Sequence, residues 1–294
     1  MTGALGIDHP LVGVRDLEAA RRTYQSLGFA MKPPGRHPWG TSTALVIFRR
    51  QLLELVSIWD DGLLDSHPAG EFRFGRHVAS HLAQGEGVAL SALYSDDAEG
   101  DATAVVSRGG HCEGTIRFGR DVVLADGTTD RTSTVLKIFT RPELSRLSIF
   151  VCQQFRRDLI EFPEWMDHPN GATGFASATI LAESKDHDRV RDWLQCLHGV
   201  TAEPTAWGFR VRTGNGWWRV ASRNNAETLF GPVPEMLAPD GAPSVASLDL
   251  RVTDLNRLHP FLKSGDFAYR EIDRQLVLTE TDRLGGILLS FQEG

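Results

Sequence analysis

The sequence predicts an α+β fold in which one β-α-β-β-β module is repeated four times and the modules pair into two domains. Two observations predict it. An apolar strand ending at an acidic or serine helix cap occurs four times, and extended segments rich in β-branched residues follow each cap. The caps lie 80, 88 and 70 residues apart, which suits a compact supersecondary module and is too long for a solenoid repeat; they are Asp16, Asp96, Ser184 and Asp254.

The first module shows the pattern most completely. Its opening strand, GIDHPLVGV, leads to the Asp16 cap, and apolar residues then recur at helical spacing over 17–27. Gly28 ends the helix. Three extended segments follow, FAMK, TALVIFRR and QLLELVSIW, with the loop PPGRHPWG after the first. The order is therefore strand, helix, strand, strand, strand.

The other three modules repeat this order from the openings GVALSALYSDD, FASATILAESKD and VASLDLRVTD. The second has AEGDATAVVSRGG as its helix. In the third, HDRVRDWLQCLHGV has helical periodicity and the strands WGFRVRT and GWWRVASR flank a Gly-Asn-Gly turn. The fourth has a short helix, LNRLHPFLKSG, made irregular by Pro260. The segment RRDLIEFPEWMDHPNGAT separates modules two and three, so we expect domains at 1–168 and 169–294.

Composition limits the classes of function. The net charge is −7 and no run of Lys or Arg stands out, so we expect neither nucleic acid nor an anionic membrane as a partner. The three cysteines, odd in number and widely spaced, predict reduced thiols. The N-terminus lacks a signal-peptide pattern, and no apolar run approaches roughly 18 residues. We therefore expect a cytoplasmic protein that binds a small molecule, with a homodimer as one option because paired modules can form a cup within one chain or between two.

Two stretches resemble a known superfamily. GIDHPLVGVRDLEAARRTYQSLGF, followed by LLELVSIW, is similar to the first module of vicinal-oxygen-chelate (VOC) proteins, and RHPWGT with HPNGA is similar to their glyoxalase-like branch. In module order the resemblance covers nearly the whole chain. It implies the glyoxalase/bleomycin-resistance/extradiol-dioxygenase fold, in which paired βαβββ modules surround a cup.

The resemblance also implies a metal site. In the superfamily, a His on the first strand and a Glu on the last strand of a module bind a divalent metal in the cup, and the matching residues here are His9 and Glu54. Imidazole and carboxylate suit Fe, Mn, Ni or Zn and leave positions open for substrate oxygens. In the second module the position matching His9 falls near Ala89, which cannot bind a metal.

The strand LSIFVCQQFR of the second module offers a third ligand, at a place where relatives carry Glu, His or Gln. Gln153 and Gln154 both lie there, and adjacent strand residues face opposite ways, so only one can point inward. We favour Gln154. In modules three and four the ligand positions fall near Ala176, Ser247 and Ser290, so we expect that half to hold no metal.

Two loops supply candidate substrate contacts. The RHPWG loop places Arg36, His37 and Trp39 near the rim, where Arg36 could hold a carboxylate or phenolate and His37 could move a proton. Equally, these residues could form only a rigid Pro-bounded loop. His168 either contributes to the cup from the second half or is a turn residue that holds the interdomain connector. Trp165 either forms part of the pocket wall or packs between the domains.

The expected function is that of a metal-dependent lyase or isomerase. A divalent metal at His9 and Glu54 would chelate adjacent oxygens of a small substrate while a side chain, Glu54 or His37, moves a proton. The first alternative is an extradiol-type ring-cleaving dioxygenase, although in those relatives the ligands lie in the C-terminal half. A further alternative is a non-catalytic protein that sequesters a small molecule without metal.

Overall fold

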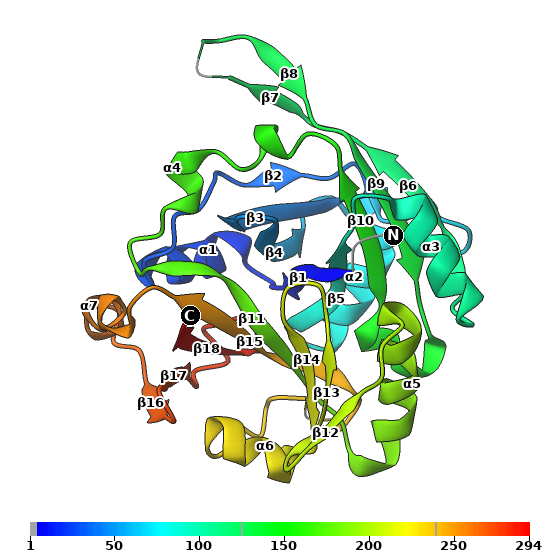
Figure 1. The fold of residues 1–294 in the computed structure, drawn as a ribbon. Helices are drawn as coiled ribbons and strands as arrows, with labels where there is room; N and C mark the ends of the chain where they lie inside the picture. The colour runs from blue at the N-terminus through cyan, green and yellow to red at the C-terminus, as the bar shows by residue number, and fades with distance from the viewer. Residues whose placement is uncertain (1–4, 125, 239) are drawn as a thin grey trace.

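Two eight-stranded sheets of identical topology make up the body of the molecule in a computed structural model that describes residues 5–124, 126–238 and 240–294 (Figure 1). In the first sheet the strand order is β2-β3-β4-β1-β5-β10-β9-β6. Its strands are β1 (Gly6–Gly13), β2 (Gly35–Arg36), β3 (Thr41–Phe48), β4 (Gln51–Ile58), β5 (Gly87–Tyr94), β6 (Cys112–Phe118), β9 (Thr134–Phe139) and β10 (Ile149–Gln154).

The second sheet has the order β12-β13-β14-β11-β15-β18-β17-β16, which repeats that of the first. In both sheets an antiparallel pair lies at the centre, β1 with β5 and β11 with β15, and parallel pairs flank it. The predicted α+β fold of four paired modules is therefore confirmed. The strands are β11 (Ala172–Leu181), β12 (Glu203–Thr205), β13 (Gly208–Arg212), β14 (Trp217–Ala221), β15 (Ser244–Val252), β16 (Tyr269–Ile272), β17 (Gln275–Leu278) and β18 (Leu288–Glu293).

Helices connect the strands of each module. No helix in the described residues is both long and apolar enough to cross a membrane. The α-helices are α1 (Leu17–Ser26), α2 (Phe74–Gln84), α3 (Ala98–Ser107), α4 (Pro163–Met166), α5 (His187–His198), α6 (Arg223–Phe230) and α7 (His259–Ser264). The 3-10 helices are η1 (Asp61–Leu63), η2 (Pro142–Leu147), η3 (Arg157–Leu159), η4 (Ser184–Asp186) and η5 (Leu255–Arg257).

The helix caps differ in detail from the prediction. Asp16 caps α1 by accepting a hydrogen bond from the Ala19 amide. In the second module the cap is Asp97 and not Asp96, because it is the Asp97 carboxylate that accepts from the amide of Gly100. Ser184 makes no cap hydrogen bond, since a 3-10 turn precedes α5.

The strand prediction for FAMK is wrong in its position. Only Met31 pairs there, through an isolated bridge to Val46, and β2 lies instead inside the expected loop, at Gly35–Arg36. The second module has an insertion, the hairpin β7 (Asp121–Val123) and β8 (Thr129–Arg131), which projects from the body (Figure 1).

The two halves share one hydrophobic core. Its buried residues come from both sheets, and the Tyr24 hydroxyl in α1 donates to the Leu284 carbonyl at 3.1 Å. The Trp193 indole N–H in α5 donates to the Leu147 carbonyl at 2.9 Å. The chain passes from the first sheet to the second between Gln154 and Ala172, and a domain boundary at 168 remains a prediction.

Candidate metal and substrate site

The first sheet encloses a small cavity of about 30 Å³. This volume holds an ion or one or two water molecules and is too small for an organic substrate. Apolar side chains, among them Trp39, Phe74 and Phe150, form most of its wall. Its polar lining is His9, His37, Glu54, Arg120, Thr134 and Gln154.

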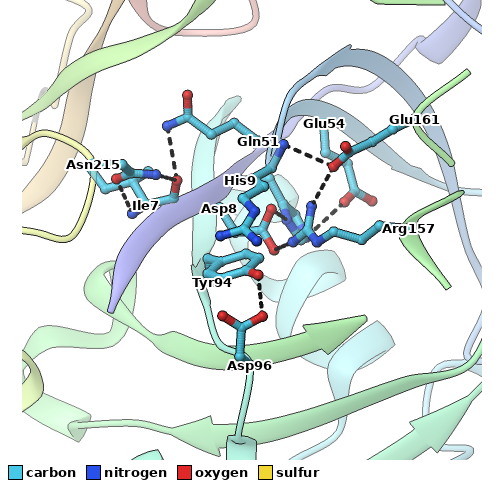
Figure 2. Close-up of polar contacts among 11 residues, drawn as sticks. Ile7, Asp8, His9, Gln51, Glu54, Tyr94, Asp96, Arg157, Glu161 and Asn215 are labelled. Atoms are coloured by element: carbon cyan, nitrogen blue, oxygen red, sulfur yellow. Dashed lines mark hydrogen bonds and ion pairs between the residues drawn. The ribbon is translucent and has the colours of Figure 1, made fainter. Parts of the chain in front are cut away.

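His9 and Glu54 face each other in this cavity (Figure 2). His9 lies on β1 and Glu54 on β4, and the parallel register places Leu11 opposite Glu54. The distance from His9 Nε2 to Glu54 Oε2 is 3.4 Å, and each residue is 5% exposed. The structure thus brings together the two residues that the resemblance selected.

Asp8 lies behind His9, a contact that the sequence analysis did not anticipate. Its carboxylate is fully buried, its Oδ1 is 3.5 Å from His9 Nδ1, and its Oδ2 pairs with Arg157 at 2.8 Å. A carboxylate behind a metal-binding histidine fixes the ring orientation and raises its basicity. The only signal in the sequence was the acid directly before His9 in a buried strand.

A β-bulge allows neighbouring residues to lie in one polar cluster. The pairing of β1 with β5 shifts register between Ile7 and His9, so Asp8 is the extra residue. The Asn215 side chain, from the Gly-Asn-Gly turn of the second half, holds the strand here: its Oδ1 accepts from the Ile7 amide at 2.8 Å and its Nδ2 donates to the Ile7 carbonyl at 2.9 Å (Figure 2).

Three buried atoms in this cluster have no hydrogen-bond partner among the described residues. They are Asp8 Oδ1, His9 Nδ1 and Glu54 Oε1. Each such atom costs about 1–3 kcal/mol when left unpaired. The donor set fits a divalent ion that would satisfy Glu54 and the His9 ring, although no group of three or more His, Cys, Asp or Glu side chains able to hold a metal occurs in the described chain.

Of the two glutamines, Gln154 lies on the cavity wall. Gln153 faces away, where its Oε1 accepts from the Ala98 amide at 3.0 Å and its Nε2 donates to the Asp96 carbonyl at 2.6 Å. Gln153 therefore supports the start of α3. Gln154 is the one of the pair that could supply an oxygen to a metal.

The second module carries apolar residues at the positions equivalent to the two candidate metal ligands. The hydrogen bonds between the first and last strands of each module give Leu90 as the counterpart of His9 and Phe150 as that of Glu54. Ala89, the expected match for His9, corresponds instead to Asp8. Gln154 thus lies beyond the matched position, nearer the cavity mouth.

His37 and Trp39 both line the cavity. Their rings stack at 4.8 Å, and His37 Nδ1 lies 3.0 Å from the Thr41 hydroxyl. Burial, together with the charges of Arg120 and His9, holds the pKa of His37 well below its usual value of 6.5. The imidazole is therefore neutral near pH 7.

Three expected substrate contacts lie elsewhere. Arg36 does not line the cavity, and its guanidinium lies over the Trp59 ring at 4.3 Å. His168 is fixed between the halves, because its Nδ1 accepts from the Ala30 amide at 3.1 Å and its Nε2 bonds the Ile47 carbonyl at 3.0 Å. Trp165 packs in a small apolar cluster with Ile47.

Arg120 is a cavity residue that the sequence analysis missed. It lies in the turn between β6 and β7 and lines both the small cavity and an outer chamber of about 230 Å³. No motif marks it, because its place depends on how two sheet edges meet.

In the second sheet, the positions equivalent to His9 and Glu54 carry a polar network around one buried carboxylate. Ser177 and Arg219 are the counterparts of His9 and Glu54 in the third module. Ser247 and Ser290 are those of the fourth.

All four contact the fully buried carboxylate of Asp249. Ser177 donates to it at 2.8 Å, Ser247 at 3.1 Å and Ser290 at 2.5 Å, and Arg219 pairs with it at 2.6 Å. The Thr179 hydroxyl also donates to it at 3.3 Å, so one guanidinium and four hydroxyl groups of the chain surround this carboxylate.

Comparison with known proteins places the chain among relatives of one fold. The sequence family described as "Glyoxalase-like domain" matches residues 7–198. Among curated proteins none matches the chain.

Three solved structures are similar at low identity. A hypothetical protein from Staphylococcus aureus has a TM-score of 0.69 at 11% identity and covers 99% of this chain and 100% of its own. A mutant 4-hydroxymandelate synthase from Streptomyces coelicolor has a TM-score of 0.55 at 12% identity, over 98% and 92%. A Mn(II)-bound glyoxalase from Novosphingobium aromaticivorans has a TM-score of 0.54 at 11% identity, over 99% and 82%. At these identities the likeness concerns the fold.

Proposed function

The chain belongs to the glyoxalase-like domain family of the VOC superfamily, and on this premise we propose that it is a metal-dependent enzyme that moves a proton on a small oxygenated substrate. His9 and Glu54 would hold a divalent ion, with Gln154 as a third oxygen donor. One structural relative is a Mn(II)-bound glyoxalase, which is consistent with that choice. The reaction class is that of a lyase or isomerase.

When bound, the metal would supply Lewis-acid polarisation of two neighbouring substrate oxygens. Glu54 is the better proton acceptor of the two candidates, because its Oε1 is buried and has no hydrogen-bond partner in the described chain. His37 is suited to donating a hydrogen bond as a neutral ring, since its lowered pKa makes it a weak base. Trp39 and Phe74 exclude water from the reacting atoms.

One observation carries this proposal. Among the described residues, Glu54 Oε1 has no hydrogen-bond partner and lies beside the cavity that His9 also lines, whereas in the second sheet hydroxyl groups and a guanidinium of the chain contact the equivalent buried carboxylate. A buried polar atom without a hydrogen-bond partner destabilises the fold unless a ligand pairs with it. The ligand that suits imidazole and carboxylate is a divalent cation.

The test is the metal content of anaerobically purified protein, measured by elemental analysis for wild type, His9→Ala and Glu54→Ala. His111→Ala is the matched control, because His111 is an exposed histidine far from the cavity lining. We expect about one metal per wild-type and control chain and a loss in both cavity variants, with folding checked by circular dichroism. Wild type that stays metal-free after reconstitution would overturn the proposal and favour a non-catalytic binding protein.

Oxygen consumption separates the two enzyme classes. A lyase or isomerase consumes none, whereas a ring-cleaving dioxygenase consumes oxygen with its substrate. Catecholic compounds are the probes for this second class. Metal-dependent oxygen uptake with such a probe would replace the proton-transfer assignment by the dioxygenase one.

A further inference from the structure

The outer chamber beside the metal cavity has an unbalanced positive charge. It measures about 230 Å³, and its lining includes Lys32, Arg120 and Asp121. Asp121 is already paired with Arg131 at 2.5 Å. Within residues 5–124, 126–238 and 240–294, neither Lys32 nor Arg120 forms an ion pair.

Arg120 also forms no side-chain hydrogen bond to any described residue, although its backbone is fixed. Its amide donates to the Thr132 hydroxyl at 2.8 Å, and its carbonyl accepts from the same group at 3.2 Å. A guanidinium has five donors and is costly to desolvate without an anion beside it. Burial lowers the pKa of Arg120, and the opposing effect of the nearby Glu54 carboxylate is smaller.

The chain makes room for this guanidinium. A Cβ atom on Gly35 would lie 2.7 Å from Arg120 Nη1, so the absence of a side chain at Gly35 allows the close approach. The two cavities share Leu45, Leu52, Arg120 and Gln154, so Arg120 lies where a molecule in the chamber would extend toward His9 and Glu54.

We propose that the outer chamber binds a carboxylate group of the substrate and that Arg120 is the residue that holds it. The planar fork of a guanidinium matches the two oxygens of a carboxylate. Lys32, whose pKa is lowered by burial and by Arg120, adds a second positive charge on the same side. This inference rests on the proposed function, because it names the substrate class for the same site: a small organic acid whose other oxygens reach the metal cavity.

The test compares benzoate with benzamide, which has nearly the same shape and no charge. Binding is measured by calorimetry on EDTA-treated, metal-free protein. We expect wild type to bind benzoate at least about tenfold more tightly than benzamide, and Arg120→Gln to lose that preference. Arg117→Gln, an exposed arginine on β6, is the matched control and should keep it.

A second variant keeps the charge and moves it. Gly35→Ala should displace the guanidinium and weaken benzoate binding while leaving the fold intact, because the group that must shift is the end of a flexible side chain. Equal binding of benzoate and benzamide to wild type, no binding of benzoate, or a preference that persists in Arg120→Gln would each overturn the proposal. The last result would mean that Arg120 only balances the charge of Glu54.

Repeating the titration with His9→Ala separates this inference from the proposed function. A benzoate preference in His9→Ala with no metal in wild type would leave the anion site standing and remove the enzyme assignment. Metal in wild type without any preference for benzoate would keep the metal site of the proposed function and remove the anion site.

Discussion

The two halves of the molecule repeat one sheet topology but treat the same internal position in opposite ways. In the first sheet, His9 and Glu54 lie 3.4 Å apart with unpaired atoms beside them. In the second, Asp249 is fully buried and is contacted by one guanidinium and four hydroxyl groups. The first site is the one that we propose a metal ion completes.

This difference shows that burial of polar groups alone does not identify a functional site. Both positions bury charged side chains. Polar groups that pair with one another stabilise the fold, whereas buried polar atoms without a hydrogen-bond partner destabilise it until a ligand pairs with them. In the first half such unpaired atoms lie beside a cavity, and the outer chamber with Arg120 adjoins that cavity. Predicted variants can therefore separate stability in one half from ligand binding in the other.

The largest effect on stability is expected from Asp249→Ala. The change leaves Arg219 buried without its carboxylate, which should lower the free energy of unfolding by about 3–5 kcal/mol. Urea denaturation at pH 7 in EDTA measures it. Glu54→Gln, the matched change in the first half, should cost less than about 1 kcal/mol under the same conditions, because Glu54 has few partners to lose.

A double variant checks the cause of that loss. Arg219→Met combined with Asp249→Ala should recover part of the stability, since no charge is left unpaired. If Asp249→Ala lowered the free energy of unfolding no more than Glu54→Gln does, the Asp249 network would not contribute more to stability than Glu54.

Most of the fold could be predicted from the sequence because its determinants are local. Strand alternation, helix periodicity and caps recur four times, and they predicted the strand and the following helix that open each module. The errors came where neighbouring residues compete. Asp96 and Asp97 are both acids at a helix start, and only the geometry decides which one accepts the hydrogen bond.

The site was less predictable because it depends on distant contacts. His9 and Glu54 followed from the superfamily resemblance, but the position of Asp8 depends on a bulge held by Asn215, which lies 208 residues from Ile7 in the chain. Arg36 and Arg120 are the same residue type, so their side-chain chemistry does not tell which of them lines the cavity. Only the packing of the sheet edges places Arg120 at the cavity and leaves Arg36 over Trp59.

An intermediate effect is expected from pH in the second half. The Trp218 indole N–H donates to His198 Nε2 at 3.0 Å, and burial lowers the pKa of His198 to about 4. Below pH 6.5 the His198 imidazole is protonated in the unfolded chain, whereas in the folded chain it stays neutral until about pH 4. The free energy of unfolding therefore falls as pH falls through this window. The slope contributed by His198 is at most about 1.4 kcal/mol per pH unit.

His198→Gln tests this contribution. Glutamine can still accept from Trp218 but does not titrate, so the variant should show a flatter dependence of unfolding free energy on pH between 6.5 and 4. The pKa of His37 in the first half is lowered as well, so the His198→Gln variant retains a residual slope. Identical slopes in the two proteins would show that His198 is not neutral in the fold.

The smallest effect is expected from Arg36→Gln, and it sharpens the assignment of the substrate contacts. Arg36 is exposed and makes a cation–π contact with Trp59, which is worth about 0.5–1 kcal/mol at an exposed site. The variant should therefore lose no more than this in urea denaturation and should keep both its metal and its preference for benzoate over benzamide. A loss of that preference in Arg36→Gln would move the anion contact from the outer chamber to the RHPWG loop, because Arg36 does not line the chamber.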